Sequence, residues 1–267
     1  MRLLSWNVQW CRGIDGRVDP KRIAAEAKRA DADVICLQEI AVRFPQMAGS
    51  AGEDQVQMLL RELGGYEAFF APAVDLPGKG RRRQFGNLVM SRLPVGRVHR
   101  HLLPWPAAPD VQSMPRAVVE VVVEAPFGPL RVMTTHLEYY SKEHRAAQID
   151  RLRELHTEGC APHRPVGEPG SYESHERGTS AVICGDFNLK PDDPHYRKML
   201  DAGFVDAWQA LKPGKPRQDT FHLYDGETPC CCDYVFVTPD LVPRLRSIGI
   251  DTQTQASDHQ PVVVVLA

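Results

Sequence analysis

The sequence has no hydrophobic run that could cross a bilayer, which needs about 20 consecutive apolar residues. Its first apolar stretch, "LLSWNVQW", is interrupted by Ser5 and Asn7, so it also lacks the core of a signal peptide. The 7 cysteines are an odd number spread thinly over 267 residues, which does not fit the disulfide framework of a small secreted domain. We therefore expect a protein without a membrane segment that works in a reducing cytoplasm.

An excess of positive charge is also absent, because 32 Lys and Arg stand against 34 Asp and Glu and the net charge is -2. Coating of nucleic acid depends on many cationic contacts to phosphate, so any nucleic-acid contact must be local. Core material is plentiful, since 43% of the residues are hydrophobic and 25% are charged. Strand-like runs lie on both sides of each loop, and we expect residues 1–267 to form a single domain.

Short runs rich in Val, Ile and Leu alternate with helical patterns along the whole chain. Strands are expected over residues 2–8, 33–39, 85–91, 117–124, 130–138, 180–187, 232–237 and 261–267. The spacing of apolar residues predicts helices over 19–31, 53–63 and 141–156. The proline-rich segment 104–115 and the polar segment 160–180 are expected to be loops. Interleaved strands and helices predict an α/β or α+β fold.

Several of these apolar runs end in side chains that bind metals or transfer protons. Such residues stand at a strand end or just before a strand: Asn7, Glu39, His136, Asp186, Asn188, Asp258 and His259. Each alone has a structural explanation as a turn residue, a surface acid or a core histidine. Their joint occurrence predicts a functional site, because sites are commonly built at the ends of sheets.

The residue types of this set point to one chemistry. The oxygen atoms of Glu39, Asp186, Asp258 and of Asn7 or Asn188 are hard donors, which suit Mg²⁺ or Mn²⁺ rather than zinc. Hydrolysis of a phosphate ester needs a cation for the phosphoryl oxygens, a base for water and donors for the charge of the transition state. The set supplies each of these parts.

The motifs "SWN", "LQE", "GNLVMSRLP", "TTHLE", "GDFN", "DYVFV" and "SDH", in this order from residue 5 to residue 259, resemble the endonuclease/exonuclease/phosphatase superfamily, which has the deoxyribonuclease I-like fold. This resemblance implies a four-layered α/β/β/α sandwich with two packed mixed β-sheets flanked by helices. The "THLE" form is more similar to the branch of deoxyribonuclease I, sphingomyelinases and tyrosyl-DNA phosphodiesterases than to the exonuclease III branch. Family members are commonly monomers, and we expect the same here.

The resemblance also implies roles for individual positions. Glu39 matches the principal metal-binding glutamate, with Asn7 beside it and Asp258 as a further metal ligand. Asp186 matches the aspartate that orients or activates the attacking water. His136 and Asn188 match two donors to the phosphate. His259 matches the histidine that stabilises the transition state, and Asp233 matches the aspartate that orients this histidine.

Two further residues are candidates for substrate binding. Asn87 belongs to the motif "GNLVMSRLP", and Arg116 precedes a strand where its guanidinium could bind an oxyanion. A surface ion pair is the alternative for Arg116. The run "GKGRRRQFG" is either a loop that holds phosphates or a solvated charged turn. The run "CCCDYVF" lacks the paired spacing of a structural zinc site.

Taken together, the sequence predicts a Mg²⁺-dependent phosphodiesterase or nuclease that works by metal-assisted in-line attack of water. DNA and RNA are among the candidate substrates. One alternative is a phosphatase or a phospholipase-like hydrolase of a lipid or small-molecule phosphate. A second alternative is a non-catalytic phosphate-binding homologue, against which the intact set of polar residues argues.

Overall fold

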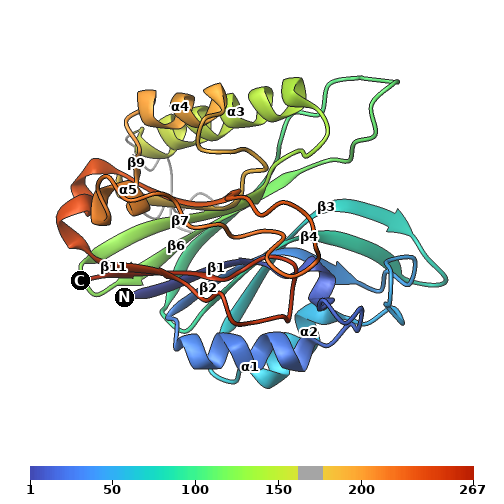
Figure 1. Cartoon of the computed structure of the whole chain (residues 1–267). Helices are drawn as coiled ribbons and strands as arrows, with labels where there is room; N and C mark the ends of the chain where they lie inside the picture. The colour runs from blue at the N-terminus through green and yellow to red at the C-terminus, as the bar shows by residue number, and fades with distance from the viewer. Residues whose placement is uncertain (162–176) are drawn as a thin grey trace, which may run out of the picture.

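The computed structural model describes residues 1–161 and 177–267, whose strands form two mixed six-stranded β-sheets (Figure 1). In the first sheet the strands lie in the order β11 (Leu245–Ile250), β12 (Val262–Leu266), β1 (Arg2–Asn7), β2 (Val34–Val42), β4 (Arg82–Ser91) and β3 (Glu67–Pro77). In the second sheet they lie in the order β5 (Val95–Leu102), β6 (Ala117–Ala125), β7 (Gly128–His136), β8 (Ala181–Asp186), β10 (Asp233–Val237) and β9 (Val205–Asp206).

Helices cover the outer faces of both sheets (Figure 1). The first sheet is covered by α1 (Pro20–Ala30) and α2 (Gln55–Glu62), and the second by α3 (Lys142–Cys160) and α4 (Pro194–Asp201). Shorter helices in the connections are α5 (Ala207–Leu211), η1 (Gln9–Cys11) and η2 (Pro239–Arg244). The expected four-layered sandwich is therefore confirmed.

Three apolar clusters fill the spaces between the four layers. Alternate residues of a strand point to opposite faces, and β1 shows this directly: Leu3 packs between the sheets, whereas Leu4 packs toward α1. On the outer face of the second sheet, Ile149 of α3 and Met199 of α4 meet Phe236 of β10. Both faces of the central strands are buried, which explains why their sequences are almost continuously apolar.

The elements expected from the sequence are found, and further ones are added. All eight predicted strands and three predicted helices are present, and the side chain of Asp19 caps the N-terminus of α1. Strands β3, β5, β9 and β11 and helices α4 and α5 were not predicted. The segment 104–115 is a loop, whereas most of the predicted loop 160–180 lies outside the described residues. Among the described helices, none combines the length and the apolar character that a membrane crossing requires.

The two ends of the chain lie side by side in the first sheet (Figure 1). Strand β1 pairs with β12 in antiparallel fashion, with Arg2 opposite Val265. The amino group of Met1 donates to the carbonyl oxygen of Leu266 at 2.6 Å. This pairing brings the end of β1 close to the residues that precede β12.

Candidate active site

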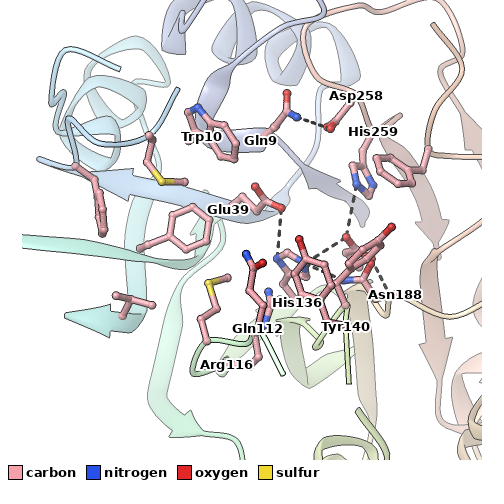
Figure 2. Close-up of a pocket in the computed structure, with 18 residues that line it drawn as sticks. Gln9, Trp10, Glu39, Gln112, Arg116, His136, Tyr140, Asn188, Asp258 and His259 are labelled. Atoms are coloured by element: carbon pink, nitrogen blue, oxygen red, sulfur yellow. Dashed lines mark hydrogen bonds and ion pairs between the residues drawn. The ribbon is translucent and has the colours of Figure 1, made fainter. Parts of the chain in front are cut away.

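One cavity of about 560 Å³ lies where strand ends of the two sheets meet (Figure 2). Most of the site residues proposed from the sequence line it: Glu39, Arg116, His136, Asp186, Asn188, Asp258 and His259. Asn7 and Asp233 lie just behind this lining and hydrogen-bond to it. The structure therefore brings both the proposed metal ligands and the proposed catalytic residues to one place.

A bulge in β2 aims Glu39 into the cavity. The pairing of β2 with β4 shifts register between Leu37 and Ile40, and Glu39 has a φ of 60°, in the left-handed region. Bulges commonly redirect a side chain at a site. The preceding residue, Gln38, turns inward and donates to the hydroxyl of Thr134 at 2.7 Å, which leaves Glu39 facing the cavity.

A glycine lets Asp186 come close to the neighbouring strand. Gly185 has a φ of 136°, and a Cβ atom at this position would lie 1.9 Å from the carbonyl oxygen of Thr135 on β7. Asp186 then stands directly opposite His136 on β7 and Asp233 on β10. The glycine of "GDFN" is thus required by the close approach of β8 to β7.

The carboxylate of Asp186 lies at the centre of the polar contacts. Its Oδ2 atom accepts from Asn7 at 3.0 Å and faces the Nε2 atoms of His136 and His259 at 3.5 and 3.6 Å. Its Oδ1 atom accepts from the backbone N–H of Asn188 at 2.9 Å. Burial raises the pKa of Asp186 to about 6, although the charge of His259 opposes this shift.

His259 is held by an acid on one side and an aromatic ring on the other. Its Nδ1 atom lies 2.9 Å from Oδ2 of Asp233, which also accepts from the hydroxyl of Thr220 at 2.6 Å. The ring of Phe221 stacks on the imidazole, with centroids 4.3 Å apart. Burial alone would lower the pKa of His259, but Asp233 and then Asp186 raise it to about 10. The imidazole is therefore charged at neutral pH.

The protonation state of His136 differs from that of His259. The amide of Asn188 donates to its Nε2 atom at 3.0 Å, so the proton of the neutral ring belongs on Nδ1, which lies 3.6 Å from Glu39. Burial lowers the pKa of His136 well below its usual value, and the positive charges of Arg116 and His259 add to this effect. The ring is therefore neutral.

Glu39 and Asp258 form an acidic pair without a Lys or Arg partner among the described residues. Asn7 donates to Glu39 at 3.0 Å, and Gln9 donates to Asp258 at 2.5 Å. Burial and the charge of Asp258 raise the pKa of Glu39 to about 7, and burial also raises the pKa of Asp258. Within residues 1–161 and 177–267, no Lys or Arg forms an ion pair with either carboxylate.

Asn7 connects these two groups of residues. Its amide nitrogen reaches both Glu39 and Asp186, while its amide oxygen accepts from the backbone N–H of Gln9 at 3.1 Å. In this arrangement the nitrogen, not the oxygen, faces the carboxylates. Asn7 therefore orients the acids, and its proposed role as a direct metal ligand would require the amide to turn.

The two proposed substrate-binding residues have different surroundings. Arg116 lines the cavity, its Nε atom lies 3.5 Å from Glu138, and its buried Nη1 atom has no hydrogen-bond partner among the described residues. Its ion pair is therefore buried rather than on the surface, and a donor remains for an anion. Asn87 is not among the lining residues; it donates to the carbonyl oxygen of Ala117 at 2.7 Å and ties β4 to β6.

The basic residues in the turn after β3 and at the start of β4 do not line the cavity. Arg82 forms an ion pair with Asp75 at 2.7 Å, and the guanidinium of Arg83 lies over the ring of Phe44, 5.2 Å from its centroid. Lys79 and Arg81 are exposed. These contacts favour the solvated charged turn over a loop that holds phosphates.

Several residues that support the site have little signal in the sequence. Thr220 and Phe221 lie in a long connection without periodicity, yet they orient Asp233 and His259. Gln9 follows Asn7 by two residues, and this alternation is the signal that could have identified it.

The fold and the site agree with a family assignment. Residues 4–259 match the model of the Endonuclease/Exonuclease/phosphatase family. Because this match spans nearly the whole chain, the protein belongs to that family, whose members are phosphoester hydrolases. No curated protein matches the sequence.

Solved structures share the fold over the whole length of the chain. The endonuclease/exonuclease/phosphatase from Beutenbergia cavernae DSM 12333 is 24% identical with a TM-score of 0.69, covering 100% of this chain and 72% of that one. A mannosyl-6-phosphatase from Bacteroides thetaiotaomicron VPI-5482 is 18% identical with a TM-score of 0.67, covering 100% and 99%. Humanized D. rerio TDP2 is 19% identical with a TM-score of 0.68, covering 100% and 98%. At these identities the likeness demonstrates a common fold.

Proposed function

We propose that this protein is a Mg²⁺-dependent phosphodiesterase in which water attacks phosphorus directly. The observation that supports this most strongly is the position of Asp186, which is buried between the neutral His136 and the positively charged His259. A carboxylate with a pKa near 6 is ionised at neutral pH and still basic enough to accept a proton from water.

In this reaction the chain's own residues hold the water and the phosphate. The amide nitrogen of Asn188 donates to His136 and to the carbonyl oxygen of Leu137, so its oxygen is open to orient the water. Asp186 accepts the proton as the water oxygen bonds to phosphorus and the ester bond on the opposite side breaks. The charged His259 donates to a phosphoryl oxygen whose negative charge grows in the transition state.

The donor set of the acidic pair fits a hard divalent cation. Glu39 and Asp258 offer half-buried carboxylate oxygens with raised pKa values and no Lys or Arg partner among the described residues, so a cation would remove an electrostatic cost. Asp186, Cys232 and His259 also bring ligand atoms within 4.8 Å of one another, but a thiol is a poor ligand for Mg²⁺. When bound, Mg²⁺ would neutralise charge on the phosphate.

The shape of the site favours a diester over a monoester. A second cavity, of about 630 Å³, shares Tyr139, Asn188 and Phe221 with the first. Open space therefore extends in two directions from the reacting centre, as two ester groups would need. A phosphatase is the second candidate, supported by the shared fold with a mannosyl-6-phosphatase. DNA and RNA remain candidate diester substrates, in line with the shared fold with TDP2.

Hydrolysis of bis(p-nitrophenyl) phosphate beside p-nitrophenyl phosphate, each with Mg²⁺ or with EDTA, tests this function. We expect Mg²⁺-dependent cleavage of the diester that Asp186→Asn reduces by about 10³-fold. Asp201→Asn, an exposed aspartate on α4, is the matched control and should keep the parent rate. A faster reaction with the monoester would put the phosphatase first, and parental rates in Asp186→Asn or in EDTA would refute the mechanism.

A further inference from the structure

One end of the active-site cavity is lined by large apolar side chains. We call this end the apolar subsite, and its residues are Trp10, Phe44, Met47, Val74, Phe85 and Met114. All except Phe85 are only half-buried, so carbon surface remains open. Side chains of this kind usually pack inside a soluble protein, and a concave apolar lining with a few polar groups is typical of a binding pocket.

The order of strands in the first sheet explains why this lining lies beside the acids. From β1 through β2 and β4 to β3, the cavity is bordered by Asn7, then Glu39, then Phe85 and Val74. Phe85 and Val74 are direct partners across β4 and β3, so their side chains share one face. In Figure 2, Trp10 and Asn188 lie on opposite sides of Glu39. The apolar subsite thus begins where the acidic pair ends.

The opposite end of the cleft has a different chemistry. The second cavity is lined by the basic residues Lys142, Arg145, Lys190 and His222 and by the acidic residues Asp192, Asp193 and Glu227. Among the described residues that line the first cavity, the basic side chains are Arg116, His136 and His259, all at the reacting centre. The cleft is therefore apolar at one end, polar in the middle and lined by charges of both signs at the other end.

We propose that the apolar subsite binds an uncharged aryl or alkyl ester group of the phosphodiester, while the charged end receives the more polar group. This inference rests on the proposed function only in placing the phosphate between the two ends. A nucleic-acid strand that ran through both ends would put a charged phosphate backbone against the apolar subsite, where the guanidinium of Arg83 lies over Phe44 but no cationic side chain lines the cavity itself. The natural substrate is accordingly asymmetric.

Binding of phosphonates tests the subsite without any hydrolysis, because their phosphorus–carbon bond is not an ester. We would titrate the whole protein with methylphosphonate, hexylphosphonate and benzylphosphonate in Mg²⁺ by calorimetry. Each buried CH₂ group is worth about a fourfold gain in affinity, so at least one larger phosphonate should bind at least about tenfold more tightly than methylphosphonate. Tighter binding of the benzyl compound would identify an aryl group, and tighter binding of the hexyl compound an alkyl group.

Two variants and one control test whether the apolar subsite causes the preference for the larger phosphonates. Val74→Asn and Met47→Gln replace apolar lining from separate segments with amides, and each should lower the affinity ratio at least about threefold without changing binding of methylphosphonate. Leu76→Asn, two residues further along β3 and outside the lining, is the matched control and should leave the ratio unchanged. Unaltered binding of methylphosphonate in each variant shows that the site is still folded.

The outcomes separate this inference from the proposed function. Equal binding of the three phosphonates, no binding of any of them, or a ratio that both variants leave intact would overturn the apolar subsite. Hydrolysis of bis(p-nitrophenyl) phosphate alongside such a result would show that the proposed function stands without it. A clear preference in a protein that hydrolyses neither test ester would support the subsite and count against the proposed function.

Discussion

Each side of the cleft places a histidine beside Asp186. The two histidines lie at nearly equal distances from it, but one is neutral and the other is positively charged. His136 comes from β7 of the second sheet, and His259 comes from the turn before β12 of the first. His259 has Asp233 at 2.9 Å behind its ring, whereas His136 has the amide of Asn188 on its Nε2 atom. His136 also has a second carboxylate nearby, Glu39 at 3.6 Å from Nδ1, but burial and the positive charges of Arg116 and His259 oppose its protonation. The direct hydrogen bond from His259 to Asp233 and the positive charges near His136, rather than the distance to Asp186, therefore account for the different charges.

Removing the carboxylate behind His259 should abolish this difference in charge, and it should affect turnover more than replacing His136 does. Asp233→Asn takes away the strongest influence that raises the pKa of His259 to about 10, so this pKa should fall toward the neutral range. The parent enzyme keeps His259 protonated until the pH approaches 10, whereas the variant loses the proton at lower pH. We expect turnover of the diester at pH 8 to fall about 10²-fold. A pH–rate profile from pH 6 to 10 measures both effects.

A double-variant comparison shows whether Asp233 acts through His259. If it does, Asp233→Asn combined with His259→Gln should lose no more activity than His259→Gln alone. Fully additive losses, or an alkaline limb that stays in place in Asp233→Asn, would contradict this role.

Replacing the neutral histidine should have a smaller effect. His136→Gln keeps a hydrogen-bonding side chain but loses the ring nitrogen that holds Asn188, and we expect about a tenfold loss of turnover. Because His136 is neutral throughout the working range, the shape of the pH–rate profile should not change. A shifted limb would mean that His136 titrates during catalysis. His195→Gln, on α4 and away from the cavity, is the control and should retain parental turnover.

The smallest expected effect concerns the acidic pair of Glu39 and Asp258, and it is an effect on stability. The pKa of Glu39 is raised from 4.5 to about 7, so the folded protein retains a proton that the unfolded chain has lost. Without metal, the free energy of unfolding should therefore fall as the pH rises from about 4.5 to about 7. Glu39→Gln removes this cost and should raise the free energy of unfolding at pH 8 by about 1–2 kcal/mol, or Tm by about 2–6 °C.

Thermal unfolding at pH 5 and pH 8 in EDTA, followed by addition of Mg²⁺, measures this effect. Mg²⁺ should stabilise the parent more than Glu39→Gln, because the variant lacks one charged ligand. The exposed Glu67→Gln should behave as the parent does. A Glu39→Gln variant that is less stable than the parent at pH 8 in EDTA would contradict the raised pKa.

The sequence predicted the central strands and missed the outer ones. The strands that were not predicted, β3, β5, β9 and β11, are the edges of the two sheets. Edge strands bury less of their surface, so their sequences are mixed rather than continuously apolar. β3 even contains Pro72 and Pro77, which an edge strand tolerates because one of its sides needs no backbone donors. A strand was therefore predictable from the sequence when both of its faces are buried.

The site was predictable where its residues lie in or next to such central strands. Asn7 and Asp186 end β1 and β8, and Glu39 interrupts the apolar run of β2, so their positions were evident from the sequence alone. Their charge states depend on contacts between distant segments, such as Asp233 with His259, and no local pattern encodes these contacts. The apolar subsite was not foreseen, because Trp10 lies in the three-residue helix η1 and Met114 in a loop, and neither segment is long enough to show a periodic pattern.

The pairing of β1 with β12 has a consequence for how the protein is made. Asn7 and His259 are 252 residues apart in the sequence, yet they meet in one site because β1 and β12 are neighbours. A growing chain therefore cannot assemble the catalytic centre until β12 has left the ribosome. Chains that stop before Asp258 would lack both Asp258 and His259 and should have no hydrolase activity.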